Sequence, residues 1–278
     1  MTVVFDITHS GNDLSEYDST VTDGGSLSTS ANAALASTNY GLDCALAGGT
    51  EIYGTKDATK KESFSFRGYL DPNNITMANN DSFNHIRLRQ NSSLLRIFVV
   101  TMRYTTADGY RIGFQPFDDS GSITVDIFDI SDAPHFYEFQ ITRSSGVSAN
   151  DGSIEFFLDG VSKGTVSSVD NFNIMGDEDW EYMIGAPVSL DTGTSGTFYC
   201  DEFTMNDDGS YIGPVVTVHD LTATDITTPA PVLDAPTLTS GIDGVGSAEV
   251  IYADIIHTIK PQPVQEKTPD SILTINVP

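Results

Sequence analysis

Residues 198–214, with the sequence FYCDEFTMNDDGSYIGP, contain a predicted strand and the signal that ends it. Apolar and acidic side chains are mixed over residues 198–205, as in a strand with one buried face. Residues 206–209 (NDDG) have the composition of a turn. Gly213-Pro214 closes the segment, because proline lacks the amide hydrogen that a central strand donates. We therefore expect the last strand of a domain here, followed by chain of a different kind.

Short strands separated by turns account for most of the chain before this segment. The one helix-like piece, residues 30–37 (SANAALAS), is too short to predict a helix. The pair Asp159-Gly160 is typical of a two-residue hairpin. Strands are predicted over residues 63–70, 94–104, 110–117, 123–130, 136–142, 153–158, 161–166, 181–185 and 197–205. About ten to fourteen strands with no helices between them predict a two-sheet sandwich or a barrel.

The charge of the chain excludes some partners. The 278 residues carry a formal net charge of −26, and 39% of them are hydrophobic, which is enough for a core. We expect no nucleic acid partner, because the DNA backbone is bound by clustered Lys and Arg. No window approaches the roughly 18 apolar residues of a membrane span, so no membrane partner is expected. The N-terminus lacks a basic region followed by an apolar one, which predicts synthesis in a reducing cytosol.

Residues 214–278 differ from the rest in composition. Three prolines, at positions 229, 231 and 236, favour extended chain. Two later pieces, residues 249–260 and 271–277, are strand-like, but the segment is too small to bury a core of its own. We expect an arm that becomes ordered on a partner by strand addition. The side chains expected to be buried in this assembly are Ile251, Tyr252, Ile255 and Ile256. The alternative is that the segment adds strands to its own domain.

Local patterns over residues 1–213 resemble the concanavalin A-like jelly rolls, including their laminin-G-like members. Residues 11–17 (GNDLSEY) resemble the opening turn of that family, and residues 33–35 with 40–42 resemble its next segment. Residues 151–160 (DGSIEFFLDG) are similar to the hairpin of laminin-G-like domains, and residues 199–203 (YCDEF) to the closing strand. The resemblance implies an all-β, two-sheet antiparallel jelly-roll sandwich over residues 1–213, with 214–278 as an extended C-terminal arm.

The segment at residues 220–238 (DLTATDITTPAPVLDAPTL) resembles a stretch of tailed-bacteriophage virion proteins. This resemblance implies a non-enzymatic structural or accessory virion protein, as a capsid decoration, collar, fibre or tail component. Its partners would then be other virion proteins and copies of itself. It would be located in the virion after synthesis in the host cytoplasm.

The alternative function is a carbohydrate-binding or adhesion module that contacts host or environmental polysaccharide. The jelly-roll resemblance is the reason for considering it, and a fold alone does not establish a function. Trp180 and Tyr182 are the glycan-binding candidates, because Trp180 lies in an acidic loop beside Tyr182 and could be exposed. The competing interpretation makes Trp180 a core aromatic residue at the start of a strand.

No catalytic residues are predicted. Glycan hydrolases of this fold carry acidic residues at alternate strand positions, which place two carboxylates on one face. No strand of this chain has that pattern, so we expect no enzymatic activity. No cofactor is expected, except that calcium could bind acidic loops. The candidate ligands are Asp177, Glu178, Asp179, Asp207 and Asp208, and the alternative is that these carboxylates cap turns.

The two cysteines, Cys44 and Cys200, fall on an early strand and on the last strand. In the jelly-roll fold these strands lie close together, so we expect the two residues to be neighbours. Synthesis in a cytosol favours free thiols. A disulfide between them stays an open alternative.

Overall fold

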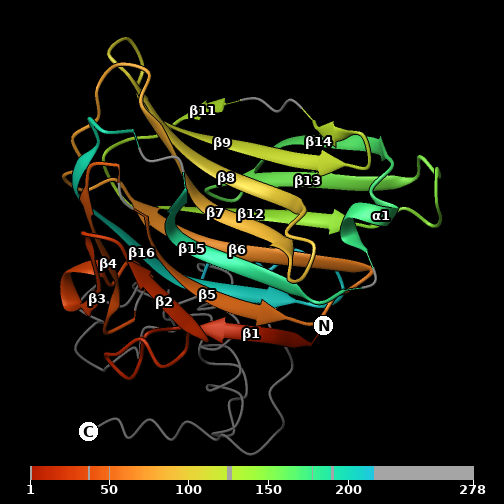
Figure 1. Ribbon diagram of the computed structural model, residues 1–278, viewed down its shortest axis with the longest axis horizontal. Coiled ribbons are helices and arrows are strands. Elements are labelled where there is room, and N and C mark those ends of the chain that lie inside the picture. Colours follow the sequence, from red (N-terminus) through yellow and green to blue (C-terminus); the bar gives the residue numbers. More distant parts are fainter. Residues whose placement is uncertain are drawn as a thin grey trace, which may run out of the picture. The chain divides into compact units, whose positions relative to one another are not determined.

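Two antiparallel sheets pack face to face in the computed structural model (Figure 1). The structure describes residues 2–215, except 37, 50, 124–126, 177 and 189–190. Aromatic side chains join the sheets: Phe66 of one stacks on Tyr182 of the other, with ring centroids 4.9 Å apart, and Phe98 stacks on Phe139. The predicted two-sheet jelly-roll sandwich is therefore confirmed.

Sheet A has the strand order β14-β13-β12-β6-β16-β4-β3, with β1 paired to β16. Its strands are β1 (Val3–Ile7), β3 (Ser26–Ser30), β4 (Gly41–Ala47), β6 (Ser63–Asp71), β12 (His135–Thr142), β13 (Gly152–Leu158), β14 (Val161–Val169) and β16 (Ser195–Asn206). The last strand thus lies inside the sheet, which explains its apolar side chains.

Sheet B has the strand order β10-β9-β8-β7-β15-β5-β2, with β11 paired to β9. Its strands are β2 (Ser19–Thr22), β5 (Ile52–Ala58), β7 (Ser82–Gln90), β8 (Arg96–Thr105), β9 (Gly109–Asp118), β10 (Gly121–Ser122), β11 (Ile127–Asp129) and β15 (Trp180–Val188). Two short helical turns complete the described residues: η1 (Ala31–Ala33) and α1 (Phe172–Met175). Neither has the length of an ordinary helix, as the sequence predicts.

Alternation and turn chemistry set the local structure. Along β13, Ile154, Phe156 and Leu158 are buried in the core, and the residues between them are more exposed. The β13–β14 hairpin turns at Asp159-Gly160, where both residues have positive φ, 51° and 78°. Asp-Gly pairs favour this two-residue turn because both positions need a left-handed backbone.

The two cysteines are buried neighbours on the adjacent strands β4 and β16 of sheet A. Their Sγ atoms lie 4.0 Å apart, and both thiols are free. Burial strongly raises the pKa of Cys200. The expected proximity of Cys44 and Cys200 is confirmed, and the two residues are free cysteines rather than a disulfide.

The chain leaves sheet A by crossing its outer face. The backbone N–H groups of Ile212 and Gly213 donate to the carboxylate of Glu138, at 2.8 and 2.9 Å. Arg67 donates to the Gly213 carbonyl oxygen, and the Val215 N–H donates to the Tyr69 hydroxyl. Residues 214 and 215 therefore still belong to the sandwich, a little beyond the predicted boundary at 213.

The chain divides into two units, Met1–Thr217 and Val218–Pro278. The predicted arm, with Ile251, Tyr252, Ile255 and Ile256, lies outside the described residues. Docking of that arm on a partner therefore stays a prediction. Among the residues that the structure describes, no helix is long and apolar enough to cross a membrane.

Candidate functional site

The two predicted glycan-binding aromatics are core residues. Trp180 and Tyr182 are both 0% exposed. The Trp180 Nε1–H donates to the Met175 carbonyl oxygen at 3.0 Å, and its ring lies 4.7 Å from that of Phe64. Their strand, β15, is hydrogen-bonded to β5 and β7 on its two sides, so inward side chains enter the core. The prediction of an exposed aromatic platform at these residues is corrected accordingly.

The predicted calcium ligands occupy turns and loop ends. Backbone N–H groups donate to Glu178 (from Ser93), to Asp179 (from Lys60), to Asp207 (from Thr2) and to Asp208 (from Ser210). Asp177 lies outside the described residues. Within the described part of the chain, no three His, Cys, Asp or Glu side chains are grouped to hold a metal ion. Calcium binding stays a prediction.

Most of the arginines gather on the outer face of sheet B. In β7, Ile86 and Leu88 are buried in the core, so Arg87 and Arg89 point to the opposite side. Arg96 pairs in register with Arg89 on the neighbouring strand β8. Five of the seven arginines belong to this face: Arg87, Arg89, Arg96, Arg103 and Arg111. In a chain of net charge −26, this is a local concentration of positive charge.

Arg87 is a buried cation without partners at two of its nitrogens. The residue is 8% exposed, and neither Nε nor Nη2 has a hydrogen-bond partner among the described residues. Its register neighbours on the two adjacent strands are Val99 and Met183, which are also buried. Burial lowers the pKa of Arg87, and the charges of Arg96 and Arg89 lower it further. An anion bound beside Arg96 and Arg89 would offset this repulsion.

The other arginines of the face fall into two groups. Arg89 is paired with Glu181 at 2.5 Å, and Arg111 is paired with Asp129 at 2.8 Å, so these charges are compensated. For the side chains of Arg96 and Arg103, the structure gives no hydrogen bond or ion pair with a described residue. Arg96 and Arg103 therefore have no carboxylate partner among the described residues, and at Arg87 the charge of Glu51 offsets the effects of burial and of the other arginines only in part.

Tyr53 of β5 brings a titratable hydroxyl to this group of charges. Tyr53 pairs in register with Gly185 of β15. Arg87 pairs with Met183 of the same strand, two residues away, so Tyr53 and Arg87 lie on the same face on either side of β15. Burial raises the pKa of Tyr53, the carboxylate of Glu51 raises it further, and Arg89 and Arg87 oppose these effects. The phenol is therefore protonated at neutral pH and can act as a hydrogen-bond or proton donor.

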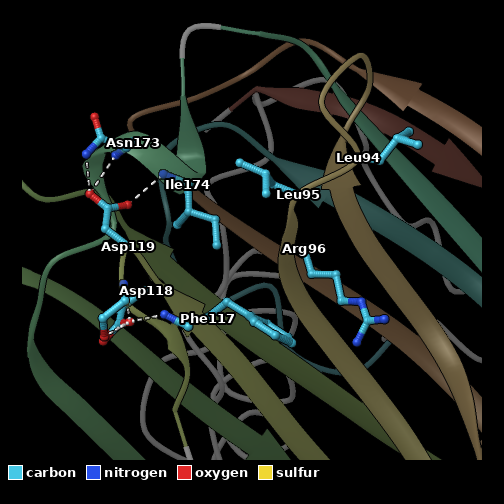
Figure 2. Close-up of a pocket in the computed structure, with 10 residues that line it drawn as sticks. Leu94, Leu95, Arg96, Phe117, Asp118, Asp119, Asn173 and Ile174 are labelled. Atoms are coloured by element: carbon cyan, nitrogen blue, oxygen red, sulfur yellow. Dashed lines mark hydrogen bonds between the residues drawn. The ribbon is translucent and has the colours of Figure 1, made fainter.

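A pocket opens at one end of the same face (Figure 2). It has a volume of about 460 Å³, within the roughly 300–1,000 Å³ usual for small-ligand sites. The residues that line it come from the turn before β8, the end of β9 and the helix α1: Leu94, Leu95, Arg96, Phe117, Asp118, Asp119, Ser120, Gly121, Asn173 and Ile174. Arg96 belongs both to this pocket and to the arginine-rich face.

The sequence contained a signal for this face. Residues 86–89 (IRLR) alternate apolar and cationic side chains, which predicts a strand with arginines on its outer side. The association of Arg87 with Tyr53 had no such signal. It depends on the spatial order of β5, β15 and β7, which are far apart in the sequence.

Solved structures share the sandwich at low sequence identity. The endo-β-1,4-glucuronan lyase of the fungus Trichoderma reesei has a TM-score of 0.57 and 13% identity, over 77% of this chain and 98% of the lyase. The cellulose-induced protein Cip1 has a TM-score of 0.54 and 14% identity, over 75% and 99%. A botulinum neurotoxin type C structure, from a protein that interacts with two ganglioside molecules, has a TM-score of 0.50 and 8% identity, over 76% and 49%. These similarities establish the fold. The sequence matches no family model and no curated relative.

The expectation that this chain is not an enzyme is wrong. It depended on the absence of the alternating carboxylates that hydrolysis of glycosidic bonds requires. The same sandwich supports a lyase in the fungal protein, and a lyase cleaves by elimination rather than by hydrolysis. The missing carboxylate pair therefore does not exclude catalysis on this fold.

Proposed function

We propose that this chain is a polysaccharide-active sandwich that holds an acidic polysaccharide on the outer face of sheet B. The observation that carries the proposal is the close grouping of three guanidinium charges, in which Arg89 and Arg96 are register neighbours and both lower the pKa of Arg87. A planar guanidinium can bind a carboxylate through two parallel hydrogen bonds. The name of the fungal glucuronan lyase indicates an acidic polysaccharide on the same fold, which supports the proposal.

The net charge of the whole chain limits the attraction between the arginines and a polyanion to short range. The net charge of −26 repels a polyanion at long range, whereas Arg87, Arg96 and Arg103 attract it at contact. Moderate salt should therefore speed association by screening the repulsion. Buried contacts at Arg87 are screened much less, so dissociation should change less with salt.

Isothermal calorimetry on the whole chain tests the binding. We expect polyglucuronate to bind and an uncharged β-1,4-glucan to bind far more weakly. Arg87→Gln should weaken polyglucuronate binding by about tenfold or more, the effect of losing a charge-assisted pair of about 1.5–3 kcal/mol. Lys163→Gln, which removes one half-buried charge from β14 of sheet A, is the matched control and should bind as the unmodified chain does. Equal binding of both polysaccharides, or an unaffected Arg87→Gln variant, would overturn the proposal.

Eliminative cleavage is the reaction that this face could support. Arg87 would neutralise the carboxylate of a uronate unit, which acidifies the hydrogen on the carbon beside it. Glu51 could accept that proton, since its charge acts on both Arg87 and Tyr53. The electrons form a carbon–carbon double bond and expel the glycosidic oxygen, which takes the Tyr53 phenolic proton. Protons and electrons balance with no co-reactant.

The product of elimination absorbs ultraviolet light because its double bond is conjugated with the carboxylate. We expect this absorbance to grow when the chain is incubated with polyglucuronate. Tyr53→Phe should abolish the growth while leaving calorimetric binding within about twofold. Binding without any absorbance change would limit the function to recognition.

The placement in a bacteriophage virion stays a prediction that depends on residues 220–238. A virion protein that contacts a bacterial surface polysaccharide would unite this placement with the arginine-rich face. Detection of the chain in purified phage particles by mass spectrometry is the direct test, and its absence from particles would rule out the placement.

A further inference from the structure

The pocket at the end of sheet B has walls suited to a sugar ring. Phe117 follows Gln115 by two residues on β9, so both side chains lie on the outer face. Leu95 and Ile174 form apolar walls beside the Phe117 ring in Figure 2. Sugars present a flat face of C–H groups that packs on an aromatic ring, with hydroxyls around its rim. A small apolar pocket with a few placed polar groups fits that shape.

The polar groups of the pocket favour an uncharged ligand. All three hydrogen bonds to Asp118, from Ser120 N, Ser120 Oγ and Gly121 N, go to Oδ1, and no described residue donates to Oδ2. Asp119 accepts hydrogen bonds from Asn173 and Ile174. The pocket thus has two carboxylates and one free guanidinium, that of Arg96. A carboxylate of a ligand would be repelled here, whereas a hydroxyl could donate to Asp118 Oδ2 and accept from Arg96.

We infer that this pocket binds one uncharged sugar unit of the same polysaccharide, so that the preferred ligand alternates acidic and neutral units. The inference depends on the proposed function of the arginine-rich face. Phe117 stacks on the sugar, Asp118 accepts a hydroxyl, and Arg96 donates to a neighbouring oxygen.

The position of the pocket agrees with a chain that runs across the strands. β9 is two strands from β7 in the sheet order, which is roughly 10 Å at about 4.8 Å per strand. Arg96, on the strand between them, connects the pocket to Arg87 and Arg89. One sugar unit is about as long as one strand spacing, so the unit next to the one in the pocket lies over β8, where its carboxylate can approach Arg96 and the neighbouring Arg89 and Arg87.

Calorimetry with two defined tetrasaccharides tests the inference. One alternates glucuronic acid and glucose, and the other contains glucuronic acid throughout. We expect the alternating tetrasaccharide to bind about tenfold more tightly. Phe117→Ala should remove most of that preference, weakening the alternating ligand by about tenfold and the acidic one by less than about twofold. Asp118→Asn keeps an oxygen acceptor and removes the charge, so it should improve binding of the acidic ligand.

Controls separate this inference from the proposed function. Tyr211→Ala removes an exposed aromatic side chain that packs on Phe157 of sheet A, and it should bind both ligands as the unmodified chain does. If Arg87→Gln weakens both ligands but Phe117→Ala weakens neither, the pocket assignment is wrong and the proposed function stands. If the acidic tetrasaccharide binds as tightly as the alternating one, the inference is also overturned. If neither ligand binds, or Arg87→Gln has no effect, both fail.

Discussion

The Tyr137 hydroxyl lies 2.9 Å from Nε2 of His85, between the two sheets and away from solvent. Nδ1 of His85 lies 3.3 Å from the Gly185 carbonyl oxygen, which fixes the proton on that nitrogen. The ring then accepts from the Tyr137 hydroxyl at Nε2. A buried polar pair of this kind is stable because the hydrogen-bonding groups of both side chains have partners. It also fixes the position of β7 relative to β12, which belongs to the opposite sheet.

His85 should make the protein sensitive to acid. Burial lowers its pKa from 6.5 to about 4, so the unfolded chain binds this proton more tightly than the folded protein. The neutral His85 side chain therefore contributes fully to stability above pH 6.5. The free energy of unfolding should fall by about 3 kcal/mol as the pH is lowered from 6.5 to 4. His85→Gln, which can still hydrogen-bond but cannot titrate, should flatten urea-unfolding free energies between these pH values. His135→Gln, at a partly buried histidine outside the core that pairs with Asp159, is the control, and an equal flattening by both would contradict the assignment.

Glu202 should have the opposite effect on the alkaline side. Burial raises its pKa to about 7, the charge of Asp6 adds to this, and Arg67 opposes it. The folded protein binds this proton more tightly than the unfolded chain, so the contribution is complete below pH 4.5 and is lost as the pH rises through 7. Glu202→Gln should be more stable than the unmodified protein at pH 8, by up to about 3 kcal/mol, and little changed at pH 5. The same change at both pH values would show that packing, not charge, decides the effect.

Much of the fold could be predicted from local sequence, because it follows from alternation and turn chemistry. The hairpin at Asp159-Gly160 and the last strand over residues 197–205 are examples, and β16 extends that strand only slightly. An exposed position could be predicted for Trp180 because its acidic neighbours resemble a surface loop. Its burial is decided by the position of β15 between β5 and β7, which local sequence does not contain. The site was predictable only in part for the same reason, since Arg87 and Tyr53 meet through that sheet order.

Gly54 should be intolerant of a side chain. A Cβ added there would lie within 2.7 Å of Cε1 of Tyr17, a buried residue of the loop before β2. Gly54→Ala should therefore displace Tyr17 and its hydrogen bond with His9, at a cost of about 1–3 kcal/mol from overpacking. Gly164→Ala is the matched control, because an added Cβ on β14 meets nothing within 4 Å. Thermal unfolding should show a clear loss for the first variant and none for the second, and equal effects would contradict the packing argument.

The segment at residues 211–215 should be part of the folded domain, whereas residues beyond 217 should not be needed for it. Shortening the chain to end at Thr217 should leave the melting temperature nearly unchanged. Ending it at Ser210 removes both N–H donors to the buried carboxylate of Glu138 and the carbonyl that accepts from Arg67. That loss should cost on the order of 2–3 kcal/mol, because hydrogen bonds to charged groups contribute more than neutral ones. Glu138→Ala in the full chain removes the same acceptor and should reproduce part of the loss. If the chain that ends at Thr217 unfolds as readily as the one that ends at Ser210, residues 218–278 complete the sandwich, and the alternative of added strands replaces the docking arm.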